Sequence, residues 1–250
     1  GSNINSGIAS SLIYGASLGG RCRYELALFE VDERSALRIY PYLKPDYMLI
    51  TNLSRDSIMR NAHPEYIRDI LTKYIPKKTK LILNADDLIC CGIAPENPRV
   101  YFGIEKMDTD VTDCVNLIND LQICPQCHRR LEYEYRRYNH IGKAYCPHCG
   151  FKAPAYDYAG CDVDLAGMKI DVKDATGVGH YRLLNESIFN IYNVVSAVAV
   201  LREIGYSHAQ IEAFFAKLNI VGSRYDAETI GSRTLYRLLA KEKNAFATTR

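Results

Sequence analysis

The sequence of 250 residues contains no tryptophan, and its 19 tyrosines are scattered along the chain. Tyrosines spread in this way do not by themselves form a platform on which nucleic-acid bases stack. No charge of one sign dominates, since 31 basic residues face 29 acidic ones, so no overall field attracts nucleic acid. No apolar run approaches the length of a membrane-spanning helix, and no signal peptide is recognisable.

Four of the nine cysteines form two close pairs, Cys124-Pro-Gln-Cys127 and Cys146-Pro-His-Cys149. Two C-x-x-C pairs at this separation are typical of a tetrahedral four-thiolate zinc site. We therefore predict a zinc ribbon over residues 122–152, with a disulfide pair or a redox motif as the alternatives. A closed four-cysteine site leaves no position open for substrate, so the predicted zinc is structural.

The other five cysteines follow no metal-binding pattern, and they are Cys22, Cys90, Cys91, Cys114 and Cys161. Free thiols beside a zinc site are typical of a reducing compartment. This cysteine usage predicts a cytoplasmic protein.

Apolar segments alternate with helical ones, which predicts a parallel α/β sheet. The expected strands cover residues 24–31, 47–52, 80–84, 99–102 and 156–173, the last with a turn at Gly167. The expected helices cover residues 65–74, 186–204 and 208–218, the last two capped by Asn185 and Ser207. The zinc ribbon interrupts this alternation, so it is expected to be an insertion. A linker at residues 221–224 precedes a further strand that begins at Thr234.

Five short motifs resemble those of the Mur ligase family, the ATP-dependent amide-forming enzymes of cell-wall precursor synthesis. They are Phe29-Glu-Val-Asp-Glu33, Asn52-Leu-Ser-Arg-Asp56, Leu83-Asn-Ala-Asp-Asp87, Asn190-Ile-Tyr-Asn193 and Gly222-Ser-Arg224. The resemblance extends from about Asn3 to Ala240. It implies a central ligase domain at residues 1–221, with the ribbon inserted, and the start of a C-terminal α/β ligase domain at residues 222–250.

The same resemblance implies a nucleotide site. Glu30 would hold magnesium, Asn190 and Asn193 would lie beside the adenine of ATP, and Arg224 would reach the nucleotide phosphates. The alternative is that Glu30 is a solvated acid, that the asparagines bond a neighbouring loop, and that Arg224 is a surface charge. The Asp86-Asp87 pair is expected to be a turn after a strand and not a site.

The ribbon, together with Cys149-Gly-Phe-Lys-Ala-Pro-Ala-Tyr-Asp-Tyr158, resembles one branch of this family, the MurT subunits of lipid II isoglutaminyl synthases. That resemblance implies ATP-dependent amidation of the D-glutamate α-carboxyl in a lipid-linked peptidoglycan precursor. Ammonia would come from a separate, GatD-like glutamine amidotransferase subunit.

Two departures from the family are evident. The phosphate-binding loop G-x-x-x-x-G-K-[ST] is absent, so this polypeptide alone is not expected to turn over ATP. Ser57 stands where most Mur ligases carry histidine. No residue is assigned a catalytic role.

Two other functions remain open from the sequence. The ribbon has more basic than acidic residues, and Tyr133, Tyr135 and Tyr138 could stack bases, which would suit a nucleic-acid-binding protein. The basic residues are Arg129, Arg130, Arg136, Arg137, Lys143 and Lys152. A Mur-like ligase that adds an amino acid is the other alternative, and Ser57 argues against it.

Overall fold

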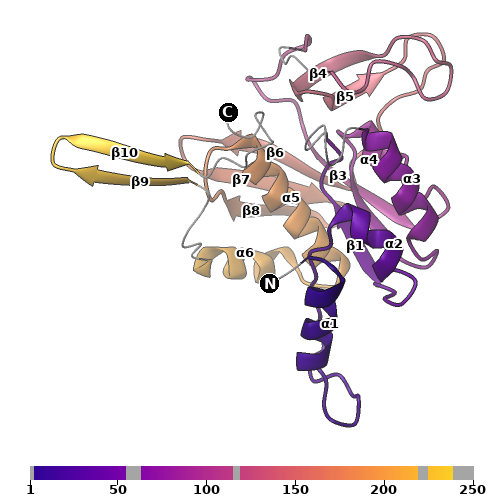
Figure 1. Cartoon of the computed structure of the whole chain (residues 1–250). Helices are drawn as coiled ribbons and strands as arrows, with labels where there is room; N and C mark the ends of the chain where they lie inside the picture. Colours follow the sequence, from indigo (N-terminus) through magenta and orange to yellow (C-terminus); the bar gives the residue numbers. More distant parts are fainter. Residues whose placement is uncertain (1–2, 55–62, 115–118, 219–224, 239–250) are drawn as a thin grey trace.

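A six-stranded mixed sheet forms the centre of the molecule (Figure 1). The computed structural model describes residues 3–54, 63–114, 119–218 and 225–238. The strand order is β1-β2-β3-β6-β7-β8. Strands β1, β2, β3 and β6 are parallel, β7 is antiparallel to β6, and β8 is antiparallel to β7. The strands are β1 (Tyr47–Ile50), β2 (Lys80–Asn84), β3 (Arg99–Ile104), β6 (Tyr158–Asp164), β7 (Lys169–Asp174) and β8 (Gly177–Arg182). The predicted parallel-rich α/β fold is confirmed.

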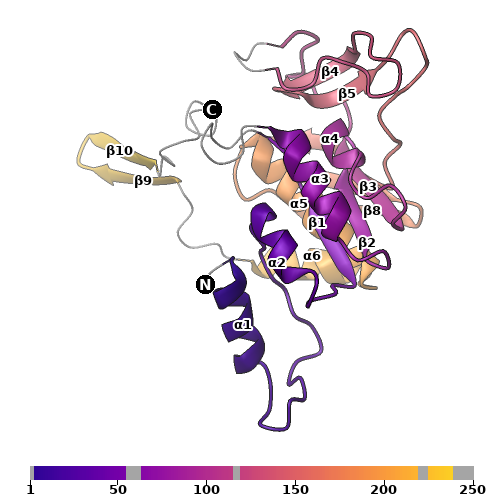
Figure 2. The same ribbon diagram turned by 45° about the vertical axis from the view of Figure 1, so that its right-hand side comes forward.

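Helices cover both faces of this sheet (Figures 1 and 2). The long helix α5 (Ile188–Glu203) and α6 (His208–Lys217) pack on one face. The other face carries α2 (Ala36–Ile39), α3 (Pro64–Tyr74) and α4 (Leu88–Cys91), with α1 (Asn5–Tyr14) and the short 3-10 turn η1 (Glu33–Ser35) nearby. Alternate residues of a strand point to opposite faces, and β2 is buried on both.

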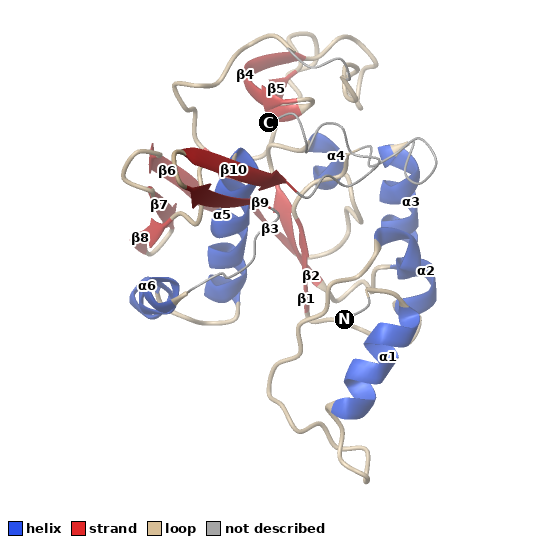
Figure 3. Cartoon of the chain, turned by 60° about the vertical axis from the view of Figure 1, so that its left-hand side comes forward, coloured by secondary structure: helices blue, strands red, loops and turns tan. Residues whose placement is uncertain are grey.

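Two hairpins lie outside the central sheet (Figure 3). The first, β4 (Glu132–Tyr138) with β5 (Ile141–Tyr145), belongs to the predicted ribbon. The second, β9 (Tyr225–Ile230) with β10 (Arg233–Leu238), includes the strand expected from Thr234. The domain limits given above stay predictions.

Of the two helix caps predicted from the sequence, the cap of α6 is confirmed and the cap of α5 is not. Ser207 accepts from the Gln210 N–H and Gln210 bonds back to Ser207, a complete capping box that confirms the predicted cap of α6. The predicted cap of α5 is wrong, because Ser187 occupies the N-cap position. Asn185 instead accepts a hydrogen bond from the Ser187 N–H at 2.9 Å.

The expected buried strand at residues 24–31 is also wrong. This segment is irregular and pairs with no strand of the described chain, and the Leu26 and Leu28 side chains are exposed. Only Phe29 and Val31 pack on the core beneath α2 and α3. An apolar segment becomes a strand only where a neighbouring strand accepts its hydrogen bonds, and here none does.

Among the described residues, no helix combines the length and the apolar character that crossing a membrane would require.

Candidate functional site

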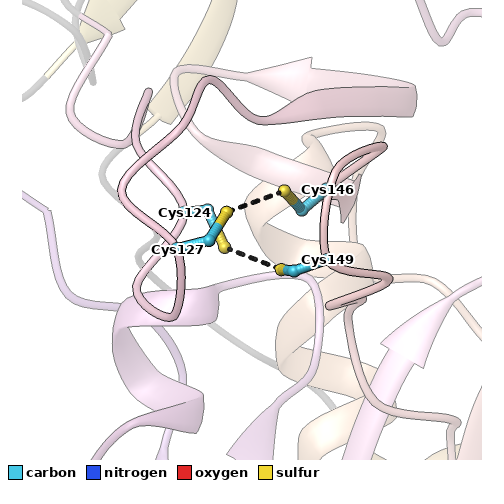
Figure 4. Close-up of side chains that lie close together, drawn as sticks. All are labelled: Cys124, Cys127, Cys146 and Cys149. Atoms are coloured by element: carbon cyan, nitrogen blue, oxygen red, sulfur yellow. Dashed lines mark hydrogen bonds between the residues drawn. The ribbon is translucent and has the colours of Figure 1, made fainter.

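The four paired cysteines converge in space (Figure 4). The Sγ atoms of Cys124 and Cys149 lie 3.7 Å apart, those of Cys127 and Cys146 lie 3.5 Å apart, and all four fall within 4.8 Å of one another. A tetrahedral ion with metal–sulfur bonds of about 2.3 Å places its sulfurs about 3.8 Å apart. A disulfide would require about 2.05 Å, and all four thiols are free. The cluster could hold a metal ion.

Each C-x-x-C turn has the same backbone geometry. The His128 N–H donates to the Cys124 carbonyl at 3.0 Å, and the Gly150 N–H donates to the Cys146 carbonyl at 3.1 Å. Both donor residues have positive φ, 59° at His128 and 75° at Gly150. This sharp turn directs the two sulfurs of a pair to the same side.

The clustered thiols influence one another's ionisation. Burial by itself raises the pKa of Cys146, but the backbone N–H groups of Cys149 and His148 lower it to about 7. At Cys149 the Phe151 N–H favours the thiolate, yet desolvation and the neighbouring thiols raise the pKa to about 12. Such opposite shifts are expected where sulfurs share one negative charge. A bound cation would allow all four to be thiolates.

The end of the β4–β5 hairpin lies at the carboxyl ends of β2 and β3, where β4 places the Arg137 side chain. The Arg137 Nη1 atom lies 2.8 Å from Asp86 Oδ2, and Nη2 donates to the Ile104 carbonyl at 2.7 Å and lies 3.2 Å from Asp110 Oδ2. The side chains of Arg137 and Asp86 are 1% and 0% exposed. This ion pair is therefore fully desolvated, and its charges depend on each other.

Asp86 accepts hydrogen bonds from several other elements. The Tyr192 hydroxyl on α5 donates to Oδ2 at 2.7 Å, the Tyr156 hydroxyl donates to Oδ1 at 2.5 Å, and the Ile104 N–H donates to Oδ2 at 3.1 Å. One carboxylate thus connects the ribbon, the sheet and α5.

Asp87 connects the ribbon to the loop that follows β1. Its Oδ1 atom lies 3.1 Å from His140 Nε2, and its Oδ2 atom accepts from the Leu53 N–H at 2.7 Å. It also caps α4 by accepting from the N–H groups of Ile89 and Cys90. Carboxyl ends of parallel strands are where open α/β sheets bind ligands. The two aspartates fix the backbone at such an edge.

The pKa of Asp87 is lowered from its ordinary value of 3.8. Burial raises it, but the charge and the hydrogen bond of His140, with the Leu53 N–H and the Cys90 thiol, outweigh burial. Because the folded pKa is below the unfolded one, the resulting stabilisation is complete above about pH 4 and disappears as the pH falls through the folded pKa.

Asp87→Asn is accordingly expected to lower the melting temperature at neutral pH and to flatten its decline below about pH 4. Melting temperatures measured from neutral to acidic pH test this. The matched control is Asp69→Asn, whose side chain is 68% exposed and which should change neither quantity. If the melting temperature of Asp87→Asn fell below about pH 4 as steeply as that of the wild type, the lowered pKa of Asp87 would be contradicted.

The structure describes three of the four residues predicted to bind nucleotide or magnesium. Asn190 is half-buried and Asn193 is exposed, and both lie in the N-terminal half of α5, on either side of the Tyr192 that bonds Asp86. Glu30 is exposed in the irregular segment before η1. Arg224 and Ser57 lie outside the described residues. Glu30, Asn190, Asn193 and Arg224 stay predicted ligands.

Asp86 and Asp87 are more than the turn that the sequence predicts after a strand. They follow β2 after Ala85, but both side chains are 0% exposed and bind the ribbon. A pair of acids after a strand gives no sign of burial. The residues that bury them, Arg137 and His140, are about fifty positions away in the chain.

The ribbon surface is less suited to nucleic acid than its composition indicates. Arg136 and Arg137 are buried, with 7% and 6% of the whole residue exposed, and Arg137 is paired with Asp86. Tyr133, Tyr135 and Tyr138 are buried as well. These side chains are not available to contact phosphates or stack bases.

Comparison with known proteins gives a consistent set of relatives, although no family model matches the chain. The chain is 30% identical over 218 residues to the lipid II isoglutaminyl synthase subunit MurT of Staphylococcus aureus (strain COL), covering 86% of this chain and 47% of that protein. It is 29% identical over 250 residues to the MurT subunit of Streptococcus pneumoniae (strain ATCC BAA-255 / R6), covering 96% and 54%. The solved pseudomurein peptide ligase type C of Methanothermus fervidus superposes with a TM-score of 0.61 at 28% identity, covering 78% of this chain and 38% of that one. The chain spans about half the length of the curated relatives it matches.

Proposed function

From the premise that this chain is a homologue of the MurT subunits with the fold of the Mur ligases, we propose that its protein amidates lipid II. The identity of 30% over most of the chain is the observation that carries this proposal. ATP would phosphorylate the α-carboxylate of D-glutamate and release ADP. Ammonia would then displace phosphate from the acyl phosphate and leave D-isoglutamine.

The proposal includes a partner and a location. The relatives are named as subunits of a glutamine-hydrolysing enzyme, so we assign the supply of ammonia to a GatD-like amidotransferase subunit. The reaction would take place in the cytoplasm, with contact to the membrane only through the lipid-linked substrate.

The proposed cofactors are zinc and magnesium. Cys124, Cys127, Cys146 and Cys149 suit zinc by their sulfur spacing and their four soft donors. Glu30 is the proposed magnesium ligand, and Asn190, Asn193 and Arg224 are the proposed contacts to ATP. When bound, magnesium would offset the negative charge that develops on the transferred phosphoryl group.

Mass spectrometry of the stem peptide tests the reaction. The full-length protein, incubated with ATP, magnesium, ammonium and lipid II, is expected to convert the D-glutamate acid to the amide. Omission of ATP is the control and should leave the acid. Nucleotide binding without amidation, with the partner subunit also supplied, would contradict the proposed acceptor.

A ligase that adds an amino acid is the second candidate. The similarity to a pseudomurein peptide ligase, at 28% identity, favours it. The same assay separates the two functions when ammonium is replaced by a mixture of amino acids. A peptide extended by one residue would support the second candidate, and an amide formed only with ammonium would support the first.

A further inference from the structure

We infer that the ribbon is a positioning element for the carboxyl edge of the sheet. Metal binding at the four cysteines orders the β4–β5 hairpin, Arg137 and His140 of that hairpin hold Asp86 and Asp87, and the aspartates fix the loops after β1 and β2. The part of this inference that concerns nucleotide binding rests on the proposed ligase function. The part that concerns backbone order does not.

The charges at this edge come from two different parts of the chain. Asp86 and Asp87 are adjacent carboxylates with fully buried side chains. Within the described residues, Asp86 pairs with Arg137 of β4, and Asp87 pairs with His140 in the turn of the hairpin. Buried carboxylates are stable only when such partners are held in place.

A backbone contact strengthens the attachment. The Gly142 N–H donates to the Asp86 carbonyl at 2.9 Å. A side chain at position 142 would overlap the Tyr135 carbonyl oxygen, so only glycine allows β4 and β5 to approach this closely. The hairpin therefore binds both the side chain and the main chain of Asp86.

The effect extends to a second loop through Asp87. Because Oδ2 of this carboxylate accepts from the Leu53 N–H, moving His140 would disturb a contact in the loop after β1. Asn84 adds a parallel link, since its side-chain amide donates to the Thr51 carbonyl at 2.9 Å. The Leu53–Asp87 bond joins two of the family motifs noted in the sequence, those that begin at Asn52 and Leu83.

The metal site lies within the same small core. The apolar cluster of the ribbon contains two of the four cysteines and also Leu88 of α4, the residue after Asp87. Its buried members are Leu88, Cys124, Leu131, Tyr133, Ala144, Cys146 and Ala153. A core of this size does not hold a hairpin without metal. Loss of the metal should therefore loosen the packing around Leu88 and the hairpin contact to Asp87, and so disturb the position of Asp87.

Amide hydrogen exchange on the full-length protein tests the inference. Cys127→Ser, which removes one thiolate, and Arg137→Met, which keeps the cysteines, are each expected to raise exchange at Leu53, Ile89 and Ile104 about tenfold. Amide exchange in the double variant should be no faster than in either single variant, because the two substitutions remove the same support. Arg129→Ala, an exposed ribbon cation that bonds His148, is the matched control and should change exchange at these amides less than twofold.

Exchange that rises only within residues 122–152 after metal loss would overturn the inference. If Arg137→Met does not fold, Arg137→Lys replaces it, since one ammonium keeps the charge but not the second hydrogen bond. Its expected exchange lies between those of the wild type and Cys127→Ser, and wild-type exchange at all three amides would overturn the assigned role of Arg137.

Nucleotide affinity distinguishes positioning from simple stability. At a temperature well below the melting transition of each variant, Cys127→Ser and Arg137→Met should weaken magnesium–ATP binding about tenfold, and Arg137→Lys should restore part of it. Equal affinity in the wild type and Cys127→Ser would overturn the positioning role. No binding by the wild type, with the exchange pattern as expected, would reject the ligase function and leave the structural coupling supported.

Discussion

Arg137→Met is expected to lower the free energy of unfolding by about 3–5 kcal/mol, because it leaves the Asp86 carboxylate buried without its cation. Methionine fills a similar volume, so the cost comes from the lost charge and hydrogen bonds and not from a cavity. The guanidinium also donates to the carbonyls of Ile104 and Glu105, and both acceptors would lose a partner. Urea unfolding followed by circular dichroism measures this difference.

A matched change elsewhere isolates the effect of burial. Arg129→Met makes the same chemical change on the exposed surface of the ribbon and should alter the free energy of unfolding by less than about 0.5 kcal/mol. The double variant Arg137→Met, Asp86→Asn should be less destabilised than the sum of its two single variants, because the second change removes the uncompensated charge. A loss below about 1 kcal/mol in Arg137→Met would contradict a desolvated ion pair between these residues.

Cys127→Ser is expected to weaken zinc binding more than about a hundredfold. Partners that only support a metal ligand already contribute about 10–100-fold to affinity, and a thiolate that binds the metal directly contributes more. The ribbon should then lose its ordered structure, because metal binding supplies the folding free energy of such small domains. Competition with a chromogenic chelator gives the affinity, and hydrogen exchange over residues 122–152 gives the order.

Cys22→Ser is the matched control for this prediction. Cys22 is an exposed cysteine outside the cluster, so its replacement should leave both the zinc content and the exchange of the ribbon unchanged. Retention of one zinc per chain in Cys127→Ser, at chelator concentrations that do not strip the wild type, would reject the four-cysteine site.

Features with a local cause could be predicted from the sequence. The strand at residues 80–84 was predicted at the limits that β2 has, and the helix expected at residues 65–74 begins only one residue earlier. The Ser207 cap was confirmed because its hydrogen bonds involve residues of the next turn. The convergence of the four cysteines was foreseeable for the same reason, since each C-x-x-C turn needs only a few neighbouring residues.

Features that depend on a distant partner were missed or misplaced. Residues 24–31 are apolar enough for a strand, but a strand also needs a neighbour, and sequence composition does not supply one. Arg136 and Arg137 look like surface cations in the sequence, yet the packing of the hairpin buries both.

The sequence by itself determined the α/β class, the ribbon and the family resemblance, because periodicity, capping and cysteine spacing act over a few residues. Only the tertiary structure decided that Asp86 and Asp87 connect the ribbon to the sheet. Their environment is made by Arg137, His140, Tyr156 and Tyr192, which come from other elements. The physical reason is that burial and charge pairing are properties of an assembled interior, and no local pattern of residues encodes which side chains will meet there.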